Sequence, residues 1–127
     1  EYVFSCLIET DKSLNYYERL LEVQKDLSDI IQQFKPDKAV IEKLFFATNQ
    51  KTALLVAQSR GVIALECYKN GIEVVDVSPT QMKLAVTGDG RATKEIVGDM
   101  VFRQLKLTSA NKVVDDTVDA MGLALMG

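Results

Sequence analysis

Hydrophobic residues change their spacing along the chain, and these changes mark out its elements. Residues 1–9 alternate loosely between apolar and polar, which predicts a strand. From Ser13 to Phe34 the apolar positions follow a helical period, which predicts an amphipathic helix that Ser13 caps. Lys35-Pro36 ends this helix, because the residue before a proline avoids the helical conformation. The apolar run in Lys38–Glu42 then predicts a buried strand that ends at Glu42.

The rest of the chain continues to alternate between strand and helix signals. Ser78 with Gln81 forms a capping box, and Pro79 favours the first position of the same helix. The predicted elements are a helix over about Gln50–Tyr68, a strand over Ile72–Val77, a short helix from Ser78 that Gly88-Asp89-Gly90 breaks, and helices over about Ala92–Leu105 and Val114–Met126. This order predicts an α/β fold, with helices around a mixed or parallel sheet. No linker or repeat divides the sequence, so we expect one domain over residues 1–127.

Composition removes several classes of function. The 127 residues include no histidine, which excludes Ser-His-Asp and Cys-His triads and imidazole-bound metals. Cys6 and Cys67 lack metal-ligand spacing, and no signal peptide or apolar stretch of membrane-spanning length is present. We therefore expect a cytoplasmic protein that makes no membrane contact.

Asp116 and Asp119 form the sharpest local feature. On a helix they lie one turn apart on the same face, close enough to share a metal ion. The surrounding residues are mostly apolar, and buried carboxylates are unfavourable unless they are paired or bind a metal. The alternative is that Asp115 or Asp116 only stabilises the first turn of the helix.

Glu42 is a second candidate, because ligands in open α/β sheets bind beyond the C-terminal ends of strands. The alternative is a solvated strand end beside Lys43. Together with the Asp pair, Glu42 would complete an all-oxygen cluster that suits Mg²⁺ or Mn²⁺. Such clusters support the two-metal hydrolysis of phosphodiesters.

Basic residues and aromatic residues add weaker hints of nucleic acid. Residues 81–112 contain six basic side chains (Lys83, Arg91, Lys94, Arg103, Lys106, Lys112) against three acidic ones, in a chain of net charge −3. Arg91 and Lys94 follow a glycine-rich loop and would suit phosphate contacts, although a charge excess of this size is usually only a solvated surface. Phe45 would be able to stack on an unpaired base, or it packs in the core.

Several separate motifs, in one order, resemble the RuvC family of Holliday-junction resolvases. They are the run from Ala39 through Glu42 to Asn49, the segment Gln58-Ser-Arg-Gly61, and Asp116-Thr-Val-Asp119-Ala. Lys35-Pro36-Asp37, Gln81-Met82-Lys83 and the Gly88–Lys94 loop fall in register with them. The resemblance covers essentially the whole chain.

The resemblance implies an RNase H-like fold and a homodimer that makes paired Mg²⁺-dependent nicks in four-way DNA junctions. By position, Glu42, Asp116 and Asp119 match three of the family's four catalytic carboxylates. Lys83 and Lys94 match its basic DNA-contacting residues, and Lys94 lies close enough to assist the chemistry; Arg91 is a further candidate DNA contact. Phe45 matches the aromatic residue that stacks at the opened junction. A branch-migration motor complex is a further expected partner.

One small-residue stripe matches the family's dimer helix: Ala53, Ala57, Gly61 and Ala64. From spacing alone, this stripe packs either inside the chain or across a two-fold axis.

The chain departs from the family at its start, where the family has a central strand with an Asp-x-Gly. No residue here matches that Asp, so we expect that an N-terminal piece is missing from this sequence. Two alternatives remain within the fold: a branched-DNA-binding relative without activity, and a nuclease for another nucleic acid such as an RNA–DNA hybrid. A small-molecule α/β enzyme is a more distant alternative, since no cofactor fingerprint is present.

Overall fold

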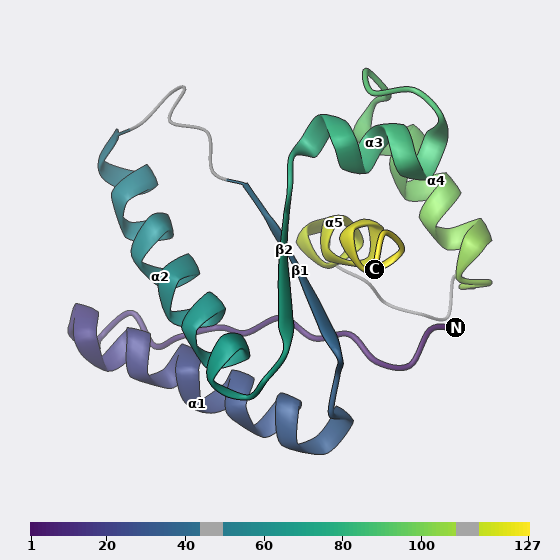
Figure 1. The fold of residues 1–127 in the computed structure, drawn as a ribbon. Helices are drawn as coiled ribbons and strands as arrows, with labels where there is room; N and C mark the ends of the chain where they lie inside the picture. The colour runs from purple at the N-terminus through teal and green to yellow at the C-terminus, as the bar shows by residue number, and fades with distance from the viewer. Residues whose placement is uncertain (44–49, 109–114) are drawn as a thin grey trace.

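The computed structural model describes residues 1–43, 50–108 and 115–127 of the chain (Figure 1). Helices cover both sides of a small central sheet (Figure 1). In chain order the elements are α1 (Tyr16–Phe34), β1 (Lys38–Glu42), α2 (Gln50–Lys69), β2 (Glu73–Val77), α3 (Pro79–Thr87), α4 (Lys94–Gln104) and α5 (Asp115–Ala124).

The described sheet consists of β1 and β2, which pair in parallel from Lys38 opposite Glu73 to Glu42 opposite Val77. Successive residues of a strand point to opposite faces, so the two faces carry different side chains. Ala39 and Val74 pack with α1 and α2, whereas Val40 and Val75 pack with α3, α4 and α5. Figure 1 shows these two groups of helices on opposite sides of the strands.

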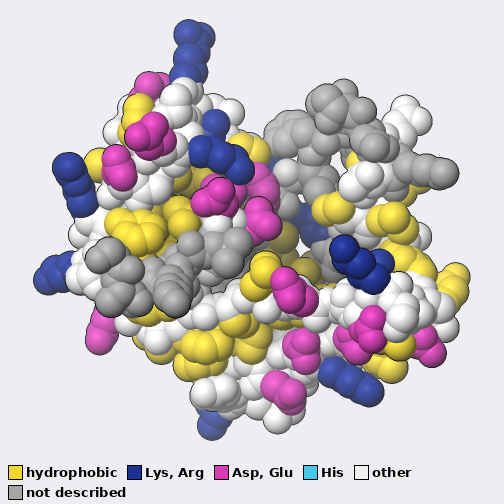
Figure 2. Space-filling view, turned by 180° about the vertical axis from the view of Figure 1, so that it is seen from behind, with side chains coloured by type: hydrophobic (Ala, Val, Ile, Leu, Met, Phe, Trp, Pro, Cys, Tyr) yellow, Lys and Arg dark blue, Asp and Glu magenta, His cyan; other side chains and the backbone are white. Residues whose placement is uncertain are grey.

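Two hydrophobic cores result, one on each side of the sheet. The larger core, on the side of α3, α4 and α5, is built from the buried residues Val77, Met82, Val86, Ala92, Val97, Val101 and Met121. The smaller core, between the sheet and helices α1 and α2, has Ile31, Cys67 and Ile72 as its buried residues. Other hydrophobic side chains remain exposed, and Figure 2 shows them on both halves of one face.

The predicted signals at α3 are confirmed. Ser78 Oγ accepts from the Gln81 amide at 3.1 Å, the Gln81 side chain accepts from the Ser78 amide at 2.9 Å, and Pro79 is the first helical residue. Gly88 ends the helix with φ +80°, a left-handed conformation that glycine adopts without steric cost. The sequence therefore defines both ends of this helix.

The cap of α1 differs from the prediction. Ser13 does not cap it; its amide and hydroxyl both donate to Asp11 Oδ1, at 2.9 and 2.8 Å. Asn15 caps the helix instead, in a reciprocal box with Glu18. The sequence contains this signal, since Asn15 and Glu18 have the spacing of a capping box.

The strand predicted over residues 1–9 is wrong. These residues form no ladder of backbone hydrogen bonds with the described part of the chain, and a strand requires such a partner. Their alternation also does not match burial, because Val3 and Phe4 are 71% and 50% exposed. The Phe4 ring instead stacks on the Phe34 ring, with centroids 5.0 Å apart.

Cys6 is exposed and Cys67 is buried, and both are free thiols. Within the described residues, none of the helices combines the length and hydrophobicity that crossing a membrane requires.

Candidate active site

The end of β1 meets three helices at a small pocket. This pocket has a volume of about 150 Å³, and its lining residues are Glu42, Pro79, Met82, Lys83, Lys94, Val97 and Asp119. Four of the residues proposed from sequence are among them, and they come from β1, α3, α4 and α5. The fold thus brings together side chains that lie up to 77 positions apart in the chain, from Glu42 to Asp119.

Strand alternation explains why Glu42 reaches this pocket. Glu42 follows Val40 by two residues and therefore points to the same face of the sheet, toward α3, α4 and α5. Burial and the negative charge of Asp119 raise the pKa of Glu42, and the positive charge of Lys94 opposes that rise. The three side chains therefore act on one another electrostatically.

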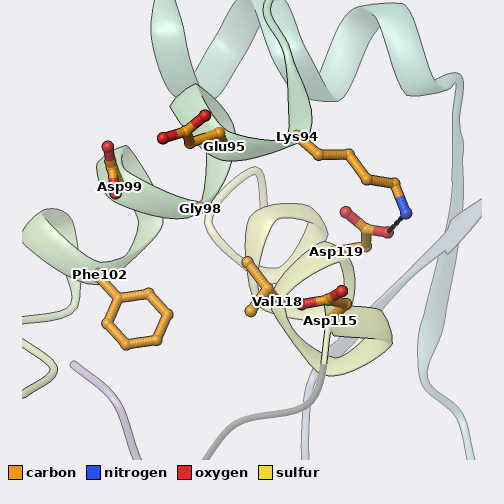
Figure 3. A pocket seen from close by; sticks show the side chains of 8 residues that line it. All are labelled: Lys94, Glu95, Gly98, Asp99, Phe102, Asp115, Val118 and Asp119. Carbon is orange, nitrogen blue, oxygen red and sulfur yellow. Dashed lines mark ion pairs between the residues drawn. The ribbon is translucent and has the colours of Figure 1, made fainter. Parts of the chain in front are cut away.

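Lys94 is the cation of this group. Its Nζ lies 3.9 Å from Asp119 Oδ2, an ion pair that Figure 3 shows between α4 and α5. Lys94 is also the first residue of α4, where the helix dipole disfavours a positive charge. The nearby Asp119 carboxylate supplies a negative charge that opposes this unfavourable effect.

A second pocket of about 470 Å³ adjoins the first and shares Lys94 and Asp119 with it. Figure 3 shows its wall along α4 and α5, with Phe102 and Val118 as apolar side chains. Asp115 also lines this pocket, one turn before Asp119. From sequence, Asp115 is expected at most to stabilise the first turn of the helix, although its four-residue spacing from Asp119 is the signal for a shared helix face.

Asp116 differs from Asp119 in its surroundings. It is exposed on the first turn of α5, and it does not belong to the lining of either pocket. The structure thus brings Glu42, Lys83, Lys94 and Asp119 together in the first pocket, and Asp116 lines neither pocket.

The glycine-rich loop before α4 is held by short-range hydrogen bonds. The Arg91 amide donates to Asp89 Oδ1 at 2.9 Å, and Thr87 Oγ1 accepts from the Asp89 amide at 3.0 Å. The Arg91 side chain itself is exposed, and Lys83 is half-buried. Phe45, the proposed stacking residue, lies outside the described residues.

The donor chemistry of the first pocket fits a hard cation. Glu42 and Asp119 both offer carboxylate oxygens, and their mutual repulsion is the kind of strain that a divalent cation relieves. Across residues 1–43, 50–108 and 115–127, no three His, Cys, Asp or Glu side chains lie close enough together to hold a metal ion. In the first pocket the described structure places two carboxylates, those of Glu42 and Asp119.

Comparisons with known proteins identify the family of this chain. The family model of the crossover junction endodeoxyribonuclease RuvC matches residues 1–127. The curated RuvC of Brachyspira hyodysenteriae is 42% identical over 123 residues, which is 97% of this chain and 75% of that protein. The RuvC of Caldicellulosiruptor saccharolyticus is 41% identical, over 93% of this chain and 70% of its own length.

Two solved structures have a similar fold. The Thermus thermophilus RuvC structure gives a TM-score of 0.83 at 27% identity, over 93% of this chain and 70% of that one. The same protein in complex with a Holliday junction gives a TM-score of 0.84, over 92% and 70% of the two chains. These structures confirm the RNase H-like α/β fold expected from sequence. The chain belongs to the RuvC family of crossover junction endodeoxyribonucleases, whose members require a divalent metal ion.

Proposed function

We propose that this protein resolves four-way DNA junctions by nicking opposed strands in a Mg²⁺-dependent reaction, with Mn²⁺ as a substitute. The observation that carries the proposal is the pocket that unites Glu42, Asp119, Lys83 and Lys94. Carboxylates for a hard cation and ammonium groups for phosphate are the two needs of a metal-dependent nuclease. Residues 1–127 are proposed to form one nuclease domain.

Glu42 and Asp119 would hold the metal ions, together with Asp116 as the resemblance implies. When bound, such ions activate a water molecule and stabilise the leaving oxygen of the phosphodiester. The raised pKa of Glu42 supports this role, because a carboxylate under repulsion from a neighbour gains most from a nearby cation.

Lys94 is proposed to orient Asp119 and to neutralise charge at the scissile phosphate. Its side chain is 76% exposed, which leaves room for contact with an incoming phosphate as well as with Asp119. Lys83 and Arg91 would contact the DNA backbone, and Phe45 would stack at the open centre of the junction. Binding should therefore weaken with added salt.

A homodimer fits the outer surface of α2. An added Cβ at Gly61 would have no atom within 4 Å, so this position of the small-residue stripe makes no close contact with the described residues of its own chain. Leu54, Leu65 and Tyr68 on the same helix are 61%, 67% and 78% exposed. A second copy of the chain would bury these side chains.

The remaining proposals are a branch-migration motor complex as partner, which rests on the resemblance, and a cytoplasmic location. The free thiols of Cys6 and Cys67 fit a reducing compartment.

A synthetic four-way junction incubated with the protein and Mg²⁺ tests the function. We expect paired nicks, their loss in Glu42→Gln, and junction binding in both proteins. Tight binding without nicks by the unaltered protein would contradict the proposed chemistry and make it a junction-binding relative. Faster cleavage of an RNA–DNA hybrid than of the junction would contradict the proposed substrate.

A further inference from the structure

Arg60, on α2, connects the end of β1 to β2. Its Nε donates to the backbone carbonyl oxygen of Glu42 at 3.2 Å, and its Nη2 donates to Asp76 Oδ1 in an ion pair. One guanidinium therefore contacts two strands: Glu42, the candidate catalytic residue, at the end of β1, and Asp76 on β2. The fixed planar geometry of arginine donors makes such a double contact directional.

The two contacts lie on the face of the sheet away from the pocket. Asp76 pairs in register with Ile41, and alternation places both on the α1 and α2 face, while the Glu42 side chain points to the opposite face. Arg60 thus contacts the backbone of Glu42 from the α1 and α2 side of the sheet, opposite to the side that the Glu42 carboxylate faces. Its side chain is 25% exposed, less than that of Asp76 at 48%.

This contact lies at the C-terminal end of β1, where Glu42 is the last residue of the strand. The Lys43 amide donates to the Val77 carbonyl at 2.8 Å and ties the next residue to β2 as well. The backbone orientation of Glu42 determines where its carboxylate lies. A displacement of about 1 Å of a catalytic group can lower a rate by about 100-fold.

We propose that Arg60 is a positioning residue for Glu42: it holds the carbonyl of Glu42 against β2 through Asp76 and so sets the direction of the carboxylate in the pocket. This inference rests on the proposed function of Glu42. It predicts that loss of the guanidinium impairs the chemical step and metal binding, and leaves recognition of the junction intact.

The test compares Arg60→Met, Arg60→Lys and Asp76→Asn by single-turnover nicking of a four-way junction with enzyme in excess. We expect Arg60→Met to slow nicking by about 10- to 100-fold at unchanged junction affinity. Arg60→Lys should fall between it and the unaltered protein, since one ammonium keeps only one of the two contacts. Asp76→Asn should have the smallest effect, because its amide oxygen can still accept from Arg60.

A second readout is independent of catalysis. Calorimetric titration of the DNA-free protein with Mn²⁺ should show weaker binding in Arg60→Met and normal binding in Asp76→Asn. Gln24→Leu serves as the matched control, because it removes another tie to α2, the 3.0 Å hydrogen bond from Gln24 Nε2 to Glu66 Oε2. It should lower Tm and leave nicking and Mn²⁺ binding unchanged.

The outcomes separate the two proposals. If Glu42→Gln nicks normally, the proposed site is wrong and this inference falls with it. If Glu42→Gln is inactive and Arg60→Met nicks at the normal rate, only the inference is overturned. It is also overturned if Arg60→Met loses junction affinity in step with rate, or if Gln24→Leu shows the same loss of rate. Should Arg60→Met fail to fold, the rate and Mn²⁺ affinity of Arg60→Lys decide in the same way.

Discussion

The two sides of the sheet differ in the size of their hydrophobic cores. On the side of α3, α4 and α5, Val97 and Val101 are 2% and 0% exposed, and the site sits directly on this packed core. On the side of α1 and α2, the core is smaller, and Leu65 and Tyr68 stay largely exposed. A close-packed core holds catalytic groups in place, whereas exposed apolar surface is typical of an interaction face.

The pKa values of two glutamates, one on each side of the sheet, shift in opposite directions. Burial and Asp119 raise the pKa of Glu42, so its ionised form is disfavoured in the folded protein. A hydrogen bond from Gln24 is the largest influence that lowers the pKa of Glu66 between α1 and α2, so its ionised form is favoured. Desolvation and repulsion thus dominate at Glu42, whereas hydrogen bonding dominates at Glu66.

The largest expected effect is on activity. Glu42→Gln should slow junction nicking by about 1000-fold, because several kcal/mol of metal-dependent transition-state stabilisation would be lost. Glu66→Gln should nick at the normal rate per folded molecule. Single-turnover assays of both variants check this, and equal losses would show that the two sides are not functionally distinct.

Substitutions on the two sides of the sheet should differ in their effect on stability. Met82→Ala removes a side chain that is 5% exposed in the larger core and should lower the free energy of unfolding by about 2–5 kcal/mol. Leu65→Ala, at a position 67% exposed, should change it by at most about 0.5 kcal/mol in the monomer. Urea unfolding at low protein concentration measures both, and a large effect of Leu65→Ala there would mean that α2 is already packed within one chain.

The capping boxes of α1 and α3 allow the same kind of substitution to be compared on the two sides of the sheet. Asn15→Ala at α1 and Ser78→Ala at α3 should each reduce stability by about 1 kcal/mol, because each leaves a helix amide without its acceptor. Ser78→Ala should also slow nicking, since α3 carries Lys83 and Met82 into the pocket. Denaturation and nicking assays on both variants test this; slowed nicking in Asn15→Ala would contradict it.

The smallest expected effect is the pH dependence of stability. The raised pKa of Glu42 means that its ionisation destabilises the fold at neutral pH, so Glu42→Gln should slightly raise Tm there, with the gain vanishing below the unfolded-state pKa. The lowered pKa of Glu66 has the opposite sign: its ionised form stabilises the fold above the unfolded-state pKa. Glu66→Gln should therefore lower Tm at neutral pH, with less difference in acid. Thermal melts across pH check both signs.

Local signals in the sequence predicted much of the secondary structure. The boundary of α3 is encoded by Ser78, Pro79 and Gly88, whose effects act within a few residues. The strand predicted over residues 1–9 is wrong because a strand depends on a pairing partner elsewhere in the fold, which local alternation cannot identify. Spacing predicts Ser13 as the cap of α1, but Ser13 donates to the Asp11 side chain and Asn15 caps the helix. Spacing alone does not show the contact with Asp11.

The sequence by itself determined the chemistry that this protein can use: carboxylates and lysines without histidine, on helices and strands whose ends are locally encoded. The resemblance to the family also indicated Glu42, Asp116, Asp119 and Lys94 as candidates. Only the tertiary structure decided that Glu42, Asp119 and Lys94 share a pocket, that Asp115 but not Asp116 lines the adjoining one, and that Arg60 contacts the backbone of Glu42. The reason is physical: caps and periodicity act over one or two turns, whereas a site depends on packing between residues far apart in the chain.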